Sequence, residues 1–369
     1  MNPFRYGQIV SKNHYCHRPE LEMQLKKYLI SGQNTYIEGE RRAGKTSLIF
    51  ETTRKIRSKW IIYVDLLEVK TVEDIFKRFL NGIVKAKSVG HLFQNIIKRA
   101  STLRPVMTFD PFNGLPSISI DTTLELKPES LEGILDLFSE KEFHNAIVVI
   151  DEFQDIVNLK NSSQVLAVMR SKVQFYQEIP FVFCGSIRST INKIFTDHDS
   201  PFFKSALPLE VGAIEDSNFS KFISSKFKDS KIKINQDIIN RIFDICKRNP
   251  GDIQQLCYAL CNVTEEGEQI SVETINRTLI HIFAQERKGY ESNLARLTSI
   301  QLKCLIAVAK RGGKNTSSKE FIVHSGVTQP TTIKKALTRL VELKILFTTD
   351  GEYRFINPFF AGWLIHKNL

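Results

Sequence analysis

Residues 39–46 read Gly-Glu-Arg-Arg-Ala-Gly-Lys-Thr, a complete G-x-x-x-x-G-K-T pattern. The residues before it (34–38) predict a short buried strand, and those after it (46–57) predict a helix. The two glycines therefore fall at a strand-to-helix turn, where backbone N–H groups can form a concave nest at the positive end of the helix dipole. An ordinary glycine-rich turn is the alternative, but both flanks favour a phosphate-binding loop (P-loop) in a parallel α/β sheet.

The side chains of this loop have expected roles. Lys45 is expected to reach the β- and γ-phosphates of a nucleotide, and the Thr46 hydroxyl is expected to hold Mg²⁺. The sequence therefore predicts that ATP and Mg²⁺ bind here, with ADP as the product. The residues expected to contact the nucleotide are Gly39, Glu40, Arg41, Arg42, Ala43, Gly44, Lys45, Thr46 and Ser47.

A second pattern, about a hundred residues later, adds chemistry to binding. Residues 146–150 form an unbroken apolar run, which is typical of a central parallel strand covered on both faces, and Asp151 and Glu152 follow it. At the carboxyl end of such a strand, Asp151 is expected to hold Mg²⁺ through water, and Glu152 to orient and deprotonate the attacking water. A buried strand that meets solvent could also end in acids, but the P-loop in the same chain favours an ATPase.

A third strand with a polar end is predicted at residues 180–186. It ends in Ser186, whose hydroxyl can hydrogen-bond the attacking water or the γ-phosphate. Arg188 could contact the same phosphate, because phosphoryl transfer is stabilised by a nearby cation; an ordinary exposed arginine is the alternative. The candidate catalytic residues are Lys45, Glu152, Ser186 and Arg188, and the candidate metal ligands are Thr46 and Asp151.

Five short stretches occur in a characteristic order within the first 265 residues. They are 18–21 (RPEL), 39–47 (GERRAGKTS), 149–154 (VIDEFQ), 184–186 (CGS) and 201–203 (PFF). This order resembles archaeal-type ATPases of the STAND-like branch of the AAA+ proteins. The resemblance implies an ATPase core, a helical lid and a C-terminal winged helix.

The resemblance also implies further site residues. In that family the Arg-Pro-Glu-like start lies near the adenine, which places Arg18 there, and a lid closes over the nucleotide. The nearest match to the lid motif is residues 247–251, Lys-Arg-Asn-Pro-Gly, in which Pro250 and the helix after it fit. Origin-recognition-type AAA+ initiators, which also carry winged helices, show Arg where this chain has Gln254.

Length and composition agree with a protein of several domains. At 369 residues the chain exceeds a single core of about 100 to 200 residues. We predict an α/β P-loop NTPase core at 1–213, a helical lid of four or five helices at 214–290 and a winged helix at 291–369. No apolar run approaches the ~20 residues of a membrane helix and no secretory leader is visible, so a cytoplasmic protein without a membrane partner is expected. The six cysteines form no C-x-x-C pair, so neither zinc nor disulfides are indicated.

Positive charge is concentrated near the end of the chain. Residues 293–369 contain twelve Lys or Arg and four Asp or Glu, a balance of +8 within the total of +11. This asymmetry favours DNA or another anionic partner, and a solvated basic face is the alternative.

The same region has the pattern of a winged helix. Helices are predicted at 294–309, 317–324 and 328–343, and strands at 345–348 and 353–356 flank an Asp-Gly turn. In a DNA-binding version, the third helix enters the major groove and the wing touches phosphate. The outward residues of that helix are Thr331, Thr332, Lys334, Lys335 and Arg339. The alternative is a latch that packs on the ATPase core or on a partner protein, but the charge excess favours DNA.

One further segment has a readable pattern without a clear function. Residues 106–126 contain short alternating stretches with Pro and Gly, which predict a hairpin insertion. It could offer a docking surface, and a cover for the sheet edge is favoured.

The sequence as a whole predicts a slowly hydrolysing regulatory ATPase, in which the nucleotide state controls the lid and the winged-helix tail. The slow rate is inferred from Gln254 in the lid. Two other classes stay open: a DNA-binding initiator or loader of the AAA+ type, and an NTP-gated scaffold or defence sensor with little hydrolysis. A nucleotide-dependent homo-oligomer is also expected, because arginine fingers in this superfamily often come from a neighbour; Arg170 and Arg188 are unranked candidates.

Overall fold

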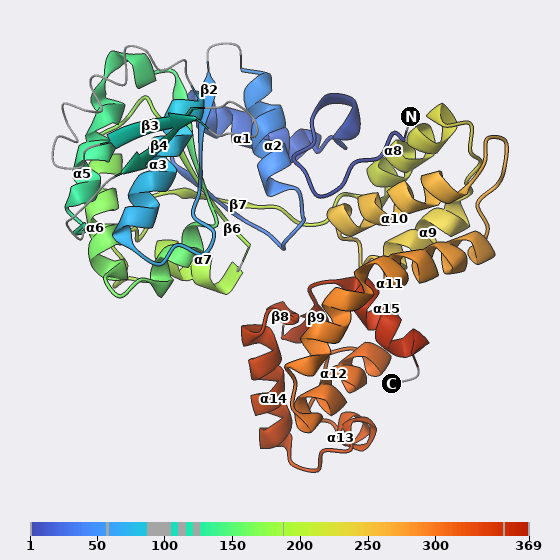
Figure 1. Ribbon diagram of the computed structural model, residues 1–369. Coiled ribbons are helices and arrows are strands. Elements are labelled where there is room, and N and C mark those ends of the chain that lie inside the picture. Colours follow the sequence, from blue (N-terminus) through green and yellow to red (C-terminus); the bar gives the residue numbers. More distant parts are fainter. Residues whose placement is uncertain are drawn as a thin grey trace. The chain divides into compact units, whose positions relative to one another are not determined.

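A computed structural model describes residues 2–56, 59–86, 105–109, 116–120, 126–186, 188–349 and 351–367 of the chain (Figure 1). For 105–109, 116–120 and 188–189 it describes the backbone alone. By their mutual contacts the residues form two compact units. One is Ile9–Gly212, and the other combines Met1–Gln8 with Ala213–Leu369.

The first unit is organised around a sheet of five parallel strands in the order β2-β5-β6-β1-β7. The strands are β1 (Thr35–Glu38), β2 (Trp60–Asp65), β5 (Ala146–Asp151), β6 (Phe181–Gly185) and β7 (Leu207–Glu210). Because all five run in the same direction, their carboxyl ends lie along one edge of the sheet. Strand β6, the first strand after the acidic pair Asp151-Glu152, lies between β1 and β5.

Helices cover both faces of this sheet, as the predicted α/β class requires. One face packs against α1 (Pro19–Ile30) and α2 (Lys45–Arg54). The other packs against α3 (Val72–Ala86), α5 (Ser130–Leu135), α6 (Ser162–Val173) and α7 (Arg188–Thr196). Short 3₁₀ helices complete this unit at η1 (Lys12–His14), η2 (Asp136–Ser139), η3 (Lys141–Phe143) and η4 (Phe153–Asn158).

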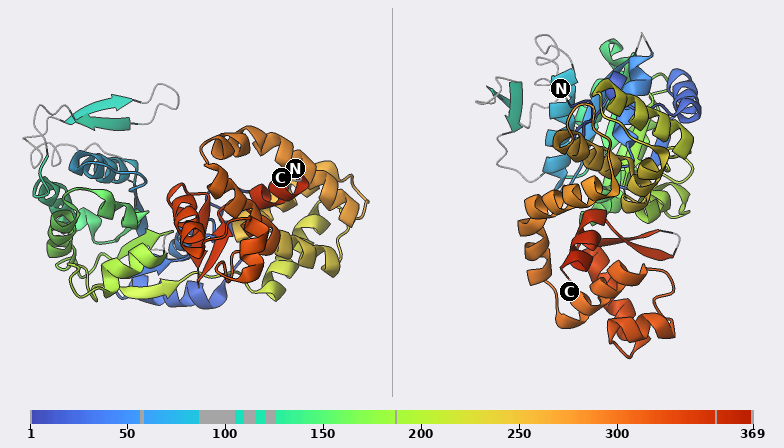
Figure 2. Two further views of the ribbon diagram at one scale, coloured as in Figure 1. Left: turned by 90° about the horizontal axis from the view of Figure 1, so that it is seen from below. Right: turned by 90° about the vertical axis from the view of Figure 1, so that its right-hand side faces the viewer.

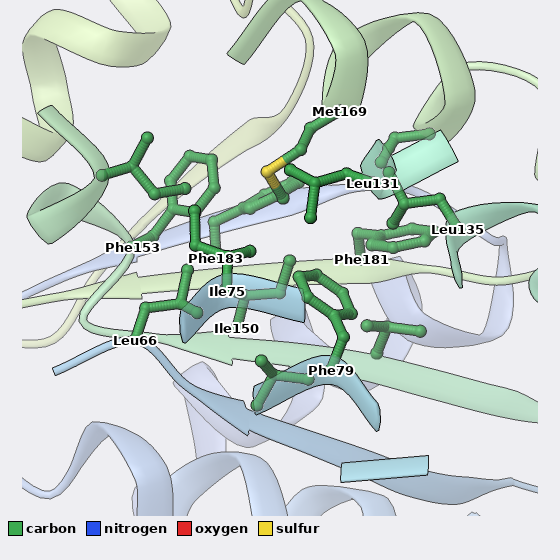
Figure 3. Close-up of a cluster of buried hydrophobic side chains, with 14 of the residues drawn as sticks. Leu66, Ile75, Phe79, Leu131, Leu135, Ile150, Phe153, Met169, Phe181 and Phe183 are labelled. Carbon is green, nitrogen blue, oxygen red and sulfur yellow. The ribbon is translucent and has the colours of Figure 1, made fainter. Parts of the chain in front are cut away.

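The central strand β5 is buried along its whole length, which explains its unbroken apolar sequence. Successive side chains alternate between faces, so Val149 joins the core under α1 and α2 while Ile150 joins the opposite core. Figure 3 shows that opposite core, where the rings of Phe153 and Phe183 lie 4.6 Å apart between their centroids. The β5 strand is thus fixed from both sides, and its carboxyl end cannot shift without disturbing two cores.

An antiparallel hairpin, β3 (Pro105–Phe109) and β4 (Pro116–Ile120), forms a separate two-stranded sheet. Strand β4 lies beside α3, as the left view of Figure 2 shows. This is the hairpin predicted within 106–126, although its first strand begins one residue earlier.

Four helices follow in the second unit: α8 (Asp216–Asp229), α9 (Gln236–Ile245), α10 (Pro250–Val263) and α11 (Val272–Ala295). The first residues of the chain pack against them. The ring of Phe4 lies 4.8 Å from that of Phe227, and the Asn2 side-chain amide donates to the Tyr258 carbonyl at 2.9 Å.

The remaining elements form a winged helix with one additional helix at its end. They are α12 (Ser299–Arg311), α13 (Lys319–Ser325), α14 (Pro330–Glu342), the hairpin β8 (Leu346–Thr349) and β9 (Glu352–Phe355), and α15 (Pro358–His366). The predicted helix at 294–309 is wrong at its start. Thr298 and Gln301 cap each other's backbone N–H groups, so that α11 ends at Ala295 and a new helix begins at Ser299.

Helix α11 joins the four-helix part to the winged helix. Glu286 on α11 accepts hydrogen bonds from Gln255 of α10 at 2.7 Å and from Asn357, the N-cap of α15, at 2.6 Å. One turn further on, Tyr290 stacks on Phe360 with 4.8 Å between ring centroids. Helix α11 is continuous across residue 290, where the predicted lid ends. The division into 1–213, 214–290 and 291–369 stays a prediction. Among the described helices, none is both long and apolar enough to cross a bilayer.

Candidate functional site

Residues 39–44 connect β1 to α2, and two glycines shape the connection. A Cβ atom on Gly39 would lie 2.4 Å from the carbonyl oxygen of Val211, so only glycine allows the chain after β7 to approach. Gly44 is the N-cap of α2 with φ of 88°, a left-handed conformation that favours glycine. The loop therefore turns tightly and directs its backbone to the N-terminus of α2.

Lys45, the first residue of α2, is held inside this loop. Its side-chain amine donates to the carbonyl oxygens of Gly39 at 2.9 Å and Glu40 at 3.0 Å, and the residue is 7% exposed. A buried ammonium group at the N-terminus of a helix adds to the positive end of the helix dipole. This combination of charges attracts a phosphate group.

The ends of α2 and β5 meet through Thr46 and Asp151, which are 105 positions apart. The Thr46 hydroxyl donates to Asp151 Oδ2 at 2.8 Å, and the Tyr63 hydroxyl donates to the same oxygen at 2.8 Å. Burial and the neighbouring Asp151 both raise the pKa of Tyr63, so it stays a hydrogen-bond donor. A hydroxyl and a carboxylate are oxygen ligands of the kind that Mg²⁺ prefers, so the residues present fit this ion.

Glu152 and Ser186 are brought together because β5 and β6 are neighbours. The Ser186 hydroxyl donates to Glu152 Oε2 at 2.7 Å, and the Gln154 amide donates to the same oxygen at 2.6 Å. Glu152 has a φ of 50°, an uncommon left-handed conformation for a non-glycine residue. Such strain is maintained only where the surroundings hold it, and it is concentrated at functional sites.

Arg18 connects the P-loop to the segment that follows β7. Its guanidinium group donates to the carbonyl oxygens of Ala43 at 2.7 Å and Gly212 at 2.9 Å, and the residue is 8% exposed. Burial lowers the pKa of Arg18. The arginine thus ties the loop to the segment after β7, a role that the sequence did not predict.

The other expected nucleotide contacts of the loop differ in exposure. Arg41 and Arg42 are exposed, whereas Ser47 is buried and its hydroxyl accepts a hydrogen bond from the Val10 N–H at 3.1 Å. The segment before α1 is therefore anchored on α2 through Ser47. The contacts expected between residues 39–47 and a nucleotide stay predictions.

Two further site predictions fall elsewhere. Arg188 is the first residue of α7, and its side chain lies outside the described part of the structure. Pro250 belongs to the second compact unit, where it begins α10 behind the N-cap Asn249. Their roles at the nucleotide stay predictions.

Sequence reasoning missed Tyr63 and Gln154 in this site. Gln154 lies inside the quoted stretch VIDEFQ, but nothing in the sequence indicates that its side chain turns back to Glu152. Tyr63 does carry a weak signal. It is a polar group near the end of an otherwise apolar strand, and such a group can lie at the same edge of the sheet as Asp151.

The five predicted DNA contacts lie on α14, the third helix of the winged helix. Lys334 and Lys335 are exposed, whereas Arg339 pairs with Glu342 at 2.6 Å. Thr331 is exposed, and the Thr332 hydroxyl lies 3.3 Å from the Gln329 side-chain oxygen. In the wing, Arg354 is paired with Glu352 at 2.8 Å, so α14 presents more unpaired positive charge than the described part of the wing.

Comparison with known proteins identifies the C-terminal module and the fold. Residues 288–366 match the family model described as "Probable winged helix domain". No curated protein matches the chain. Among solved structures, the chain is similar to the Walker-type ATPase PABY2304 of Pyrococcus abyssi, with a TM-score of 0.64 and 19% identity over 96% of this chain and 97% of that one.

Two structures from Aeropyrum pernix are also similar over almost their full lengths. The ORC1 protein in complex with DNA has a TM-score of 0.53 and 13% identity, over 97% of this chain and 96% of that one. The ORC2 protein, in ADPNP-ADP complexes, has a TM-score of 0.53 and 14% identity, over 95% of this chain and 92% of that one. At these identities the likeness concerns the fold, which is that of AAA+ P-loop ATPases with a C-terminal winged helix.

Proposed function

We propose that the chain binds ATP with Mg²⁺ at the P-loop, hydrolyses it, and contacts DNA through the winged helix. The observation that carries the first part is the pairing of Thr46 with Asp151 at 2.8 Å, beside a buried lysine at the N-terminus of α2. Chance similarity to a P-loop would not bring a hydroxyl and a carboxylate from such distant positions into one oxygen-rich site.

The chain's own residues then divide the work. Mg²⁺, when bound, would be held by Thr46 and Asp151, and it would neutralise charge on the transferring phosphoryl group. Lys45 exchanges its bonds to the loop carbonyls for bonds to phosphate. Glu152 accepts a proton from the attacking water, and Ser186 holds that carboxylate in place.

The remaining contacts are proposed from the P-loop pattern and the family resemblance. The backbone of residues 39–47 holds the phosphates, Arg18 keeps the loop in position, and Pro250 belongs to the lid that closes on the nucleotide. Arg188 is proposed to approach the γ-phosphate. Membership of the STAND-like branch is the corresponding proposal for the family.

For the partner, the comparisons favour the initiator type over a pure regulatory switch. The ORC1 structure from Aeropyrum pernix is a complex with DNA and shares this fold over almost its whole length. The charge of +8 in residues 293–369 gives this chain an anion-attracting module of the same fold. We therefore infer that DNA is the partner of the winged helix.

Slow, switch-like hydrolysis is a second proposal with its own observation. Gln254 stands at the position where the resemblance leads one to expect a lid arginine, and its side chain accepts a hydrogen bond from the Arg5 N–H at 3.5 Å. A neutral, internally bonded side chain cannot supply the missing cation to the transition state.

Nucleotide binding is tested with Lys45→Ala and the matched control Lys26→Ala, which removes an exposed lysine of α1. Titration calorimetry with Mg·ATP is expected to show at least about a hundredfold weaker binding for Lys45→Ala and unchanged binding for the control, because a charge contact in a dry site is worth several kcal/mol. Normal binding by Lys45→Ala would contradict the site.

DNA binding is tested by a gel-shift titration of a short duplex over a range of salt concentrations. The logarithm of the affinity is expected to fall by about 0.9 per neutralised phosphate for each unit of log salt. A binding curve that does not depend on salt, or no shift at all, would favour a protein partner. Size-exclusion with light scattering in ADP and in a non-hydrolysable ATP analogue then measures assembly.

A further inference from the structure

Gln154 occupies an unusual position beside the acidic pair of β5. It follows Glu152 by two residues at the start of η4, and it is 2% exposed. Its amide nitrogen lies 2.6 Å from Glu152 Oε2 and 3.2 Å from Asp155 Oδ1. Because both neighbours are carboxylates, the NH₂ group of the amide must face them.

The opposite end of the amide is unsatisfied. Gln154 Oε1 is buried and has no hydrogen-bond partner among the described residues. A Cβ atom on Gly185 would lie 2.6 Å from this oxygen, so β6 has room for the amide only because it ends in glycine. An unpaired buried carbonyl costs free energy that an apolar side chain of similar size would avoid, so a role in stability alone does not explain this glutamine.

The amide is also fixed by Asp155, the next residue of η4. Asp155 is 8% exposed and accepts from Gln154 on Oδ1 and from the Glu68 N–H on Oδ2 at 2.8 Å. Glu68 lies in the segment after β2. Hydrogen bonds therefore connect the segment after β2 to Glu152 through Asp155 and Gln154.

The two donors on Glu152 share one oxygen. Ser186 and Gln154 both donate to Oε2, and no hydrogen bond to Oε1 occurs among the described residues. Two donors on one oxygen fix the plane of the carboxylate. The second oxygen is then the one that can accept a proton.

We propose that Gln154 is a positioning residue, which orients Glu152 so that Oε1 accepts the proton of the attacking water; this inference rests on the ATP hydrolysis proposed above. In that step the water oxygen bonds to the γ-phosphorus, and the bond from this phosphorus to the bridging oxygen breaks with its electron pair leaving on ADP. The water proton passes to Glu152. In this proposal Gln154 acts through Glu152, to which its amide donates.

The test uses the full chain with Gln154→Leu and Gln154→Met, and Gln24→Leu as the control. Gln24 is an exposed glutamine of α1, where the same substitution removes a hydrogen bond to the Tyr28 hydroxyl. Each variant is assayed for ATP affinity, melting temperature and kcat. The second substitution keeps a long unbranched side chain in case leucine does not fit.

Both Gln154 variants are expected to bind ATP within about twofold of the wild type and to lose about 10- to 100-fold in kcat. The loss is expected in kcat and not in ATP affinity, because Gln154 positions the proton acceptor and does not hold the nucleotide. The control should match the wild type in all three measurements.

Unchanged kcat in folded Gln154 variants would overturn the inference and leave the ATPase proposal intact. A lower kcat together with weaker ATP binding and a lower melting temperature would also overturn it, since that pattern indicates a structural role. A wild-type chain that does not hydrolyse ATP would overturn the proposed function and this inference together.

Discussion

The P-loop unit and the winged helix bury different kinds of side chain. Within Ile9–Gly212, the buried charged residues that the structure describes are Arg18, Glu22, Lys45, Glu51, Asp151 and Asp155. In the described part of residues 288–366, the buried polar side chains are those of Ser325 and Thr349, and none is charged.

This difference separates the proposed nucleotide site, which is assembled internally, from the proposed DNA-binding surface, which would need a partner. Burying a charge is costly unless it is paired and hydrogen-bonded, so such groups gather where binding or chemistry requires them. The winged helix instead rests on apolar packing and keeps its lysines in solvent, where they can meet an anionic partner. Four variants can break or sharpen this contrast.

The largest effect is expected at the acidic pair. Glu152→Gln keeps the size of the side chain but removes the proton acceptor, so kcat for ATP is expected to fall by about a thousandfold with little change in ATP affinity. A coupled phosphate-release assay and a binding titration measure the two quantities. The control is Glu178→Gln, which changes a side chain that is 73% exposed in the same unit. Hydrolysis that survives the change would remove Glu152 as the base.

The next effect concerns packing in the winged helix. Leu337 on α14 is fully buried, so Leu337→Ala is expected to lower the unfolding free energy of this module by about 3 kcal/mol. In a Trp60→Phe background, Trp363 is the single remaining tryptophan of the chain and reports urea unfolding of the module. Thr338→Ala, at an exposed neighbouring position, should leave the midpoint unchanged. An unshifted midpoint for Leu337→Ala would contradict the apolar account of this module.

A smaller effect is expected at the exposed lysines of α14. Replacing Lys334 and Lys335 together with alanine is expected to weaken duplex binding by about tenfold and to reduce the slope of log affinity against log salt by about two. The matched control replaces Lys26 and Lys27, two adjacent exposed lysines of α1. Equal losses in both double variants would mean that α14 is not the DNA-contacting surface.

The smallest effect is a pH-dependent one in the P-loop unit. The hydrogen bond from Arg54 lowers the pKa of the buried Glu51, against the opposing effect of burial. Stability from this group is therefore present above its unfolded pKa of about 4.3 and is lost as pH falls through the folded value. Glu51→Gln should destabilise the chain by about 1 kcal/mol at pH 7, a modest figure because solvent screens Arg54, and the difference should shrink below about pH 4.

Thermal unfolding at several pH values measures that difference. Glu20→Gln, an exposed position in the first turn of α1, provides the comparison. A destabilisation that is the same at pH 7 and at low pH would show that the charge of Glu51 is not the cause.

Local patterns in the sequence were sufficient for most of the elements. The P-loop motif, the apolar run of β5 and the helical spacing of Ile333, Leu337 and Leu340 are each patterns that a short segment carries by itself. The missed break at Thr298 also had a local signal, a Thr-x-x-Gln capping pair inside a continuous apolar pattern.

Strand order and side-chain pairing were determined by tertiary structure alone. The position of β6 between β1 and β5 brings Ser186 to Glu152, and the packing of α2 on the sheet brings Thr46 to Asp151. Arg18 likewise donates to two carbonyl oxygens from segments that are distant in the chain. Gln154 donates to two carboxylates of its own segment, because its side chain turns back toward Glu152. Local spacing sets which way a side chain points from its own helix or strand, whereas the partner it meets depends on how those elements pack, which no short stretch encodes.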